Sequence, residues 1–148
     1  MSHVIRFYSV TDTCGWCSNF APYPIRLNGK TWPTSEHYFQ AQKFAAPADQ
    51  EAVRNARTPM LAARMGRDRK RKLRRDWESV KVSVMRQAVQ AKFTQHAQLA
   101  RLLLDTGEAT LIEHTEQDDD WGDGGDGHGR NMLGRILMEV REALSQRT

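Results

Sequence analysis

The stretch Thr34-Ser-Glu-His-Tyr-Phe-Gln-Ala-Gln-Lys-Phe44 has the pattern of a capped helix with one polar side. Glu36, Gln40 and Lys43 fall at i, i+4 and i+7, so in a helix they project in the same direction. Glu36 and Lys43 are then about 10 Å apart along the axis, which leaves room for a ribose-sized group. These side chains predict one wall of a small-molecule pocket. The alternative is a first-turn carboxylate that complements the helix dipole and a lysine in solvent.

The sequence on either side of this stretch predicts a mainly helical chain with a small amount of sheet. Asn28-Gly29 is typical of a tight hairpin turn. We expect strands at 4–9, 25–27, 30–32 and 110–113, and helices at about 35–45, 48–56, 59–66, 77–95, 97–105 and 132–145. The expected fold class is mainly α (α+β), with about six helices and a small N-terminal β-hairpin or sheet.

Length and composition indicate a globular protein. The chain has 148 residues, 27% of them charged, and shows no repeat or linker, so we expect one compact domain over residues 1–148. No apolar run approaches the roughly 20 residues that a membrane helix needs. The N-terminal residues lack the basic-then-apolar pattern of a signal peptide. These features predict a cytoplasmic protein without a membrane partner.

Both cysteines lie in the short motif Cys14-Gly-Trp-Cys17. Pairs with this spacing occur in zinc sites and in redox centres. The sequence has no second cysteine pair and no histidines at ligand spacing, which disfavours structural zinc. A redox centre would need a helix after the motif, whereas residues 18–22 look like a loop. The sequence therefore favours two reduced thiols in a cytosolic loop.

The net charge of +4 is unevenly distributed. Residues 64–75 hold eight Lys/Arg and one Asp, a net charge of +7, so the rest of the chain sums to −3. We call residues 64–75 the basic segment. Such a segment attracts phosphate, either on a nucleotide or along a nucleic acid. The alternative is a solvated loop without a ligand.

An acidic, glycine-rich segment covers residues 113–134 and holds six of the ten glycines. Gly122, Gly124 and Gly127 formally fit the dinucleotide pattern GxGxxG, but no βαβ unit surrounds them. An EF-hand is also excluded, because Asp123 stands where glycine is needed and Gly129 where the closing Glu is needed. The segment instead predicts a loop whose backbone can approach a ligand closely.

This loop enters the last helix near Asn131, where exposed amides can hold a phosphate or a ribose. The neighbouring carboxylates of Asp118, Asp119 and Asp120 suit acid–base work or the sharing of a divalent ion. The alternative is a flexible acidic loop with ordinary turn glycines, although Trp121 argues against pure flexibility.

Five blocks of the sequence resemble the signature of the NADAR, or YbiA-like, family. They are Trp-Pro-Thr-Ser-Glu-His-Tyr-Phe-Gln-Ala-Gln-Lys-Phe (32–44), Ala-Ala-Arg-Met-Gly-Arg (62–67), Asp-Trp-Glu-Ser-Val-Lys (76–81), Glu-His-Thr-Glu-x-Asp-x-x-Trp-Gly-Asp-Gly (113–124) and Gly-x-Asn-x-Leu-Gly (129–134). The blocks keep their order and span nearly the whole chain. The resemblance is therefore far more specific than any single motif.

The resemblance implies N-glycosidase chemistry. Similar proteins hydrolyse ribosylamino-pyrimidine phosphates of early riboflavin biosynthesis, and related ones remove ADP-ribose from guanine bases in nucleic acid. Both substrates are N-linked ribosyl compounds with a phosphate, and both stay open here. Neither a metal ion nor another cofactor is expected. The cysteine pair is not part of the family pattern.

Carried over by position, the resemblance makes Glu36 and Asp118 the essential carboxylates and Trp77 the third functional residue. Asp119 and Asp120 leave open which aspartate of the loop acts. Lys43 occupies the family's lysine position, where it can hold a phosphate or hydroxyl, or attack C1 of a ring-opened sugar to form an imine. The expected substrate-binding residues are Gln40, Arg67, Trp121, Gly122, Gly124 and Asn131.

Carboxylates beside the sugar stabilise the positive charge that grows as the C1–N bond breaks. Glu36, in a first helical turn, suits that role, and Asp118 suits proton transfer or water activation. Trp77 can stack on the base or shield the site. The alternative from another class is a non-catalytic nucleotide- or nucleic-acid-binding module that uses the basic segment. A pocket lined by carboxylates disfavours that alternative, because carboxylates repel phosphate.

Overall fold

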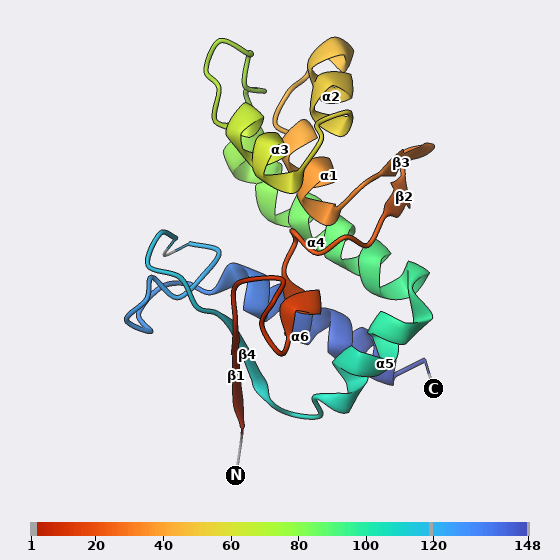
Figure 1. Cartoon of the computed structure of the whole chain (residues 1–148), viewed down its shortest axis with the longest axis vertical. Coiled ribbons are helices and arrows are strands. Elements are labelled where there is room, and N and C mark those ends of the chain that lie inside the picture. The colour runs from red at the N-terminus through yellow and green to blue at the C-terminus, as the bar shows by residue number, and fades with distance from the viewer. Residues whose placement is uncertain (1–2, 119, 148) are drawn as a thin grey trace. The chain divides into compact units, whose positions relative to one another are not determined.

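The computed structural model describes residues 3–118 and 120–147 and divides the chain into two compact units (Figure 1). Unit 1 combines the two ends of the chain, up to Ala21 and from Phe93 onwards. Unit 2 is the continuous stretch Pro22–Lys92. Each candidate site residue belongs to one of these units, so the two units are described separately.

Unit 2 begins with the predicted hairpin. Strands β2 (Ile25–Leu27) and β3 (Lys30–Trp32) pair in antiparallel fashion, with Ile25 opposite Trp32. Asn28 and Gly29 form the turn with φ values of 56° and 74°. Two consecutive positive φ values match the twist of a two-residue hairpin, and Asn-Gly adopts them most readily. The hairpin prediction is therefore confirmed.

Four helices follow in unit 2: α1 (Ser35–Ala41), α2 (Pro47–Arg54), α3 (Pro59–Gly66) and most of α4 (Trp77–Gln95). Helix α1 packs against both α2 and α3, and every one of its residues is buried. A proline opens α2 and α3, where its fixed φ suits the first turn and its missing N–H is not needed. The short α1 is thus the central helix of this unit.

The start of α1 is fixed by a closed set of hydrogen bonds around His37. The Thr34 hydroxyl oxygen accepts from the His37 backbone N–H at 3.1 Å and lies 2.8 Å from His37 Nδ1. On the other side of the ring, Nε2 donates to the Ala56 carbonyl oxygen at 3.0 Å. Burial lowers the pKa of His37, while the bond to Ala56 acts in the opposite direction. A neutral ring with its proton on Nε2 lets Nδ1 accept from Thr34.

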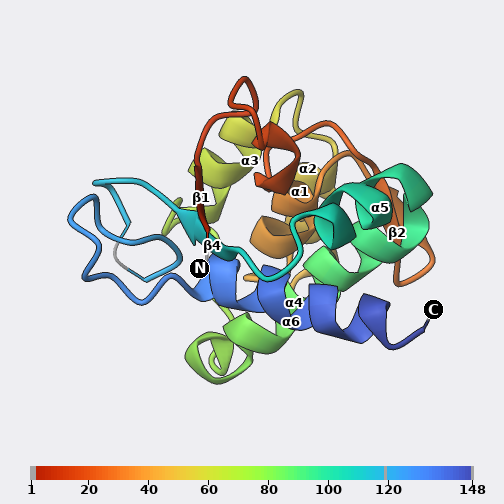
Figure 2. The ribbon, with the colours of Figure 1, turned by 90° about the horizontal axis from the view of Figure 1, so that it is seen from below.

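Unit 1 joins segments that are far apart in the sequence. Strand β1 (Val4–Phe7) pairs in parallel with β4 (Thr110–Glu113), and Val4 lies opposite Thr110. Helix α6 (Met132–Ser145) packs against β4 and against α5 (Ala97–Asp105), as Figure 2 shows from below. The buried side of α6 consists of Gly134 and of apolar residues at helical spacing: Leu133, Ile136, Leu137, Val140 and Leu144. A short 3₁₀ helix covers Gly15–Cys17.

The fold class is confirmed: the described residues form six α-helices and two small two-stranded sheets. Three elements have boundaries that differ from the prediction. The first strand ends at Phe7 rather than 9, because the Tyr8 and Ser9 amides donate to the Asp12 carboxylate, both at 2.8 Å. Helix α2 spans Pro47–Arg54 rather than 48–56, and α1 is four residues shorter than predicted. The single domain over 1–148 stays a prediction.

None of the helices in the described part of the chain is both long and apolar enough to cross a membrane. The longest, α4, spans 19 residues and contains several charged side chains.

Two N-cap threonines provide a matched test of the network around His37. Thr34 caps α1 and is buried, whereas Thr58 caps α3 and is exposed. We expect Thr58→Ala to lower the free energy of unfolding by about 1 kcal/mol, the usual cost of a lost cap. Thr34→Ala should cost about 2–3 kcal/mol, because it also leaves His37 Nδ1 without its donor.

The measurement is urea unfolding followed by circular dichroism. Thr34→Ser keeps the hydroxyl and should restore most of the loss. Equal costs at the two threonines would contradict the role assigned to the His37 network.

Candidate active site

Helix α1 holds a buried carboxylate–amide pair. Glu36 is 8% exposed and Gln40 is 7% exposed. The Gln40 amide nitrogen Nε2 donates to Glu36 Oε2 at 2.6 Å, as the i, i+4 spacing allows. The other atom of that amide, Oε1, is buried without a hydrogen-bond partner among the described residues. The pair is therefore an ordered part of the fold without any ligand.

Lys43 lies outside α1, which the sequence prediction continued to about residue 45. The helix ends at Ala41, and the amides of Lys43 and Phe44 bond to carbonyls three residues back, both at 3.2 Å. Phe44 then forms an isolated bridge with Leu73, and the Arg74 amide donates to the Lys43 carbonyl oxygen at 2.8 Å. Long-range pairing thus ends the helix, and the i+7 spacing does not determine the direction of Lys43.

The Lys43 ammonium nevertheless lies close to Phe39 of α1 and to the end of α3. Its Nζ donates to the Gly66 carbonyl oxygen at 3.4 Å and stands 5.8 Å from the centroid of the Phe39 ring. Phe39 itself is 5% exposed. The half-buried amine is held between an aromatic face and the last carbonyl of α3.

The electrostatic surroundings of Lys43 make its proton labile. Burial lowers the pKa of Lys43 from 10.5 to about 8. The neighbouring Glu36 carboxylate acts in the opposite direction. The nearby cations lower the pKa further, and they are Arg69, Arg67 and Lys81. At neutral pH roughly a tenth of the molecules therefore carry a neutral Lys43 amine.

Trp77 is the first residue of α4 and packs against Phe39. It is 6% exposed, and its ring meets Phe39 edge-on, with centroids 5.1 Å apart and an interplanar angle of 60°. Such edge-to-face contacts favour a fixed ring orientation. Trp77 therefore supports Phe39, which in turn contacts Lys43. That Trp77 also stacks on a base stays a prediction.

The basic segment presents several unpaired cations. Arg71 pairs with Asp49 at 2.8 Å, and Arg74 pairs with Asp76 at 2.6 Å. Five further basic side chains are exposed and form no ion pair in the described part of the chain: Arg64, Arg67, Lys70, Lys72 and Arg75. Arg69 donates to the Gly66 carbonyl oxygen at 3.3 Å. Arg67 and Arg69 thus belong to the surroundings of Lys43.

A cavity of about 520 Å³ lies along the basic segment. Its lining combines Lys72, Arg74 and Arg75 with the buried Phe44 and with Gln50. Gln50 Nε2 donates to the Phe44 carbonyl oxygen at 2.7 Å, which fixes that wall. The rest of the lining is the apolar Ala45 and Leu73 and the carboxylate Asp76, which pairs with Arg74, so Lys72 and Arg75 are the cations that suit a phosphate group.

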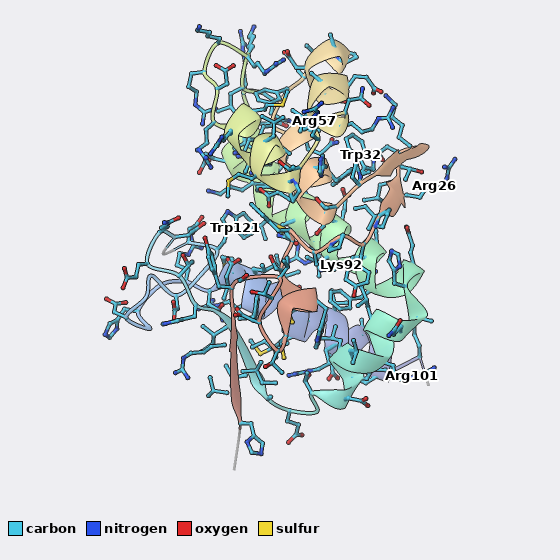
Figure 3. The ribbon with its side chains drawn as sticks, in the orientation of Figure 1. Arg26, Trp32, Arg57, Lys92, Arg101 and Trp121 are labelled. Atoms are coloured by element: carbon cyan, nitrogen blue, oxygen red, sulfur yellow. The ribbon has the colours of Figure 1, made fainter. Side chains whose placement is uncertain are left out.

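In unit 1, Asp118 organises the acidic loop between β4 and α6. Its Oδ1 accepts from the Asp120 amide at 2.9 Å and from the Trp121 amide at 2.8 Å. Asp120 differs from Asp118, because its carboxylate pairs with Arg130 at 3.0 Å. Asp119 lies outside the described residues. Figure 3 labels the half-buried Trp121 on this loop.

Asp118 also lines a cavity of about 380 Å³ that lies within the acidic loop. Glu116, Asp126 and His128 line it too, and Gly124 is one of its backbone walls. The carboxylates disfavour free phosphate in this cavity, and they can accept hydrogen bonds from the hydroxyls of a sugar.

Sequence reasoning missed the residue that holds the loop together, Asp123. This side chain is 3% exposed, and it accepts from His114 Nδ1 at 2.8 Å, from the Gly125 amide at 2.9 Å and from the Thr115 amide at 3.2 Å. Burial raises the pKa of Asp123, but these hydrogen bonds together lower it below its ordinary value. A carboxylate between two glycines in Gly122-Asp-Gly124 was the available signal.

Two predicted substrate-binding residues, Asn131 and Gly122, make contacts within the protein. The Asn131 side chain accepts from the Glu113 amide at 3.0 Å and donates to the Leu111 carbonyl oxygen at 2.9 Å, so it joins the start of α6 to β4. Asn131 has φ of 51°, a conformation that asparagine tolerates. At Gly122 an added Cβ would stand 2.7 Å from the Glu113 carbonyl oxygen. Both positions are constrained by packing.

The predicted site residues are therefore in two groups. Unit 2 brings together Glu36, Gln40, Lys43, Arg67 and Trp77, and unit 1 holds Asp118, Trp121, Gly122, Gly124 and Asn131. The joint action of Glu36 and Asp118 on one substrate stays a prediction. Within residues 3–118 and 120–147, no three His, Cys, Asp or Glu side chains are grouped so that they could hold a metal ion.

The cysteine pair is in the reduced form. Cys14 is half-buried and Cys17 is buried, and neither forms a disulfide within the described residues. Burial raises the pKa of Cys14, and the charge of Asp12 adds to this effect. A raised pKa keeps the thiol protonated, which lowers its reactivity.

Comparisons with known proteins agree on one family. The model of the NADAR domain matches residues 6–145. The chain is 60% identical to N-glycosidase YbiA of Escherichia coli over 142 residues, which cover 96% of this chain and 89% of that protein. It is 48% identical to a riboflavin biosynthesis protein of Vibrio vulnificus, covering 99% of this chain and 40% of that protein.

A solved structure is similar as well. The NMR structure of the E. coli protein YbiA aligns with a TM-score of 0.91 and 58% sequence identity, and the alignment covers 99% of this chain and 88% of that one. The family resemblance predicted from the five sequence blocks is therefore confirmed. The chain belongs to the NADAR family.

Proposed function

We propose that this N-glycosidase hydrolyses the C1–N bond of a phosphorylated ribosylamino-pyrimidine, an intermediate of riboflavin biosynthesis. The observation that carries the proposal is the Lys43 amine, whose pKa of about 8 arises among Glu36 and three cations. The name of the V. vulnificus relative, a riboflavin biosynthesis protein, supports this substrate class. A cytoplasmic location stays a prediction.

Glu36 acts on the positive charge of the sugar. As the ring opens, the C1–O4′ bond breaks, O4′ takes a proton from water, and C1 becomes doubly bonded to the base nitrogen as a cation. A carboxylate that is buried and already oriented stabilises this cation strongly, because little solvent screens it. The 2.6 Å hydrogen bond from Gln40 supports this role, since it fixes one oxygen of Glu36.

Lys43 acts as the nucleophile. Its lone pair forms a bond to C1, a proton passes from Nζ to the base nitrogen, and the C1–N bond breaks. The base leaves as a neutral amine, and C1 stays bonded to Lys43 as an iminium. Water then hydrolyses the iminium, which frees the amine and releases the open-chain sugar phosphate. Burial and neighbouring cations, both present at Lys43, are the usual means of activating such an amine.

Cations next to Lys43 can bind the phosphate group of the substrate. Arg67 is exposed and without an ion pair in the described part of the chain, and Arg69 is also exposed. A guanidinium binds phosphate oxygens in pairs, with charge-assisted hydrogen bonds. Trp77 and Phe39 provide the apolar side of the site.

A second substrate class is ADP-ribose attached to guanine in nucleic acid. The observation that favours it is the row of five unpaired, exposed cations in the basic segment. Each such cation can neutralise a backbone phosphate and release a counterion. The bond to be broken has the same chemistry, so Glu36 and Lys43 keep their roles.

The first prediction concerns both substrates and Glu36. Assayed side by side, the wild-type protein should release the base from the ribosylamino-pyrimidine phosphate faster than from ADP-ribosylated guanine. Glu36→Gln should lower the rate at least about a hundredfold, because the amide cannot balance the cation. Glu51→Gln, an exposed carboxylate of the same unit, should retain activity. Faster cleavage of ADP-ribosylated guanine would reverse the substrate assignment, and an active, folded Glu36→Gln would remove Glu36 from the mechanism.

The second prediction concerns the chemical form of Lys43. The rate should rise with pH through about 8, because only the neutral amine attacks C1. Borohydride added during turnover should leave a sugar adduct on Lys43, detected by mass spectrometry of the peptide. Lys43→Arg keeps the positive charge but cannot form an imine, so it should be inactive, whereas Lys30→Arg at an exposed ion pair should be active. Retained activity in Lys43→Arg would show that only the charge is needed.

The third prediction separates two aspartates of the acidic loop. Asp118→Asn keeps an oxygen that can accept from the amides of Asp120 and Trp121, so the loop should stay intact while the charge is lost. We expect activity to fall at least about tenfold. Asp126→Asn changes a carboxylate that lines the same cavity and accepts from the His128 amide in the same way, and it should have little effect. Equal activities of the two variants would contradict a catalytic role for Asp118.

A further inference from the structure

Gly66, the last residue of α3, lies directly against the Gln40 side chain. A Cβ added at Gly66 would stand 1.8 Å from Gln40 Oε1, 2.7 Å from its Cδ and 3.3 Å from its Cβ. Gly66 does not have a positive φ, so its backbone conformation suits any residue. A glycine is needed here for space and not for conformation. That space is occupied by the amide that bonds to Glu36.

The same residue faces the amine of the site with its carbonyl group. Gly66 O accepts from Lys43 Nζ at 3.4 Å and from Arg69 Nη1 at 3.3 Å. Carbonyls in the last turn of a helix have no partner within the helix and carry its negative dipole end. Gly66 therefore lies against Gln40, the partner of Glu36, at the place where a side chain would stand. Its carbonyl oxygen contacts Lys43.

We propose that Gly66 and Gln40 are positioning residues: Gly66 leaves the space in which the Gln40 amide lies, and Gln40 holds the Glu36 carboxylate in place. The proposal rests on the function proposed above, in which Glu36 acts on the sugar. Gly66 influences Glu36 only through Gln40, and it separately holds the Lys43 amine through its carbonyl oxygen.

The orientation of the Gln40 amide supports this role. Its nitrogen faces Glu36, and its oxygen is left buried without a partner in the described chain. An unsatisfied buried oxygen is unfavourable. The reversed amide would place that oxygen against the carboxylate, where neither group can donate. The Gln40 oxygen therefore lies against Gly66 without a partner, and the amide N–H donates to Glu36.

The effect of a methyl group at Gly66 can be separated from the stability of the fold. The atoms that an added Cβ meets are those of the Gln40 side chain, whose amide end can move. In a helix, alanine is also favoured over glycine. Gly66→Ala should therefore fold with an unfolding temperature close to that of the wild type, while its Gln40 amide turns away from Glu36.

The experiment is a double-mutant cycle with kcat and KM measured for the ribosyl substrate. Gly66→Ala should lower kcat roughly tenfold to a hundredfold, the value of a hydrogen bond to a charged group, and change KM less. Gln40→Ala should lower kcat to a similar extent. In the Gln40→Ala background, Gly66→Ala should cause no further loss, because the clashing amide is absent. Losses that multiply would overturn the proposal, as would full activity of Gly66→Ala.

A readout without catalysis is the side-chain amide signal of Gln40 in the NMR spectrum. This signal should shift in Glu36→Gln and in Gly66→Ala, whereas that of Gln42, a buried glutamine at the end of α1, should stay in place. An unchanged Gln40 signal would overturn the proposal. If Gly66→Ala fails to fold, the activity of Gln40→Leu is compared with that of the isosteric control Gln42→Leu. Equal activities overturn the proposal. A wild type inactive on both substrates would refute the proposed function instead.

Discussion

The main-chain pairing between Lys43–Phe44 and Leu73–Arg74 is the constraint on which the arrangement of unit 2 depends. The Arg74 amide donates to the Lys43 carbonyl oxygen, and Phe44 forms a bridge with Leu73. These contacts end α1 after seven residues and direct the lysine out of the helix. They also place the basic segment next to that lysine, so that Arg67 and Arg69 act on its pKa. Helix length, amine position and local charge follow from one contact.

The site combines groups whose charges oppose one another. Glu36 favours the charged form of Lys43, whereas burial and the three cations favour the neutral form. Burial and the cations outweigh Glu36, so the pKa of Lys43 is about 8 rather than 10.5. Such a balance is typical of catalytic amines, although structural ion pairs also shift pKa values. Each group has a buried hydrogen-bond partner, Gln40 for Glu36 and Gly66 for Lys43.

Local signals in the sequence predicted most of the fold. Helices α3, α4, α5 and α6 and strand β4 begin and end where the apolar spacing, the prolines and the glycines indicate. The end of α1 could not be predicted, because residues about 30 positions further along the chain determine it. The pairing of β1 with β4 joins residues more than 100 positions apart, and no local pattern encodes it. For the candidate site, the family signature predicted Glu36 and Lys43, whereas the contacts of Gly66, Asp123 and Asn131 are seen only in the structure.

The neutral His37 has a consequence for the behaviour of the protein in acid. Its ring can connect Thr34 to Ala56 only while Nδ1 keeps a free lone pair. Because burial holds the pKa of His37 below its ordinary value, the unfolded chain binds this proton more readily than the folded chain. Stability therefore decreases as the pH falls below about 6.5, and the loss originates at the N-terminus of the helix that bears Glu36. Protonation of His37 is thus a source of acid sensitivity that is distinct from the chemistry of Glu36 and Lys43.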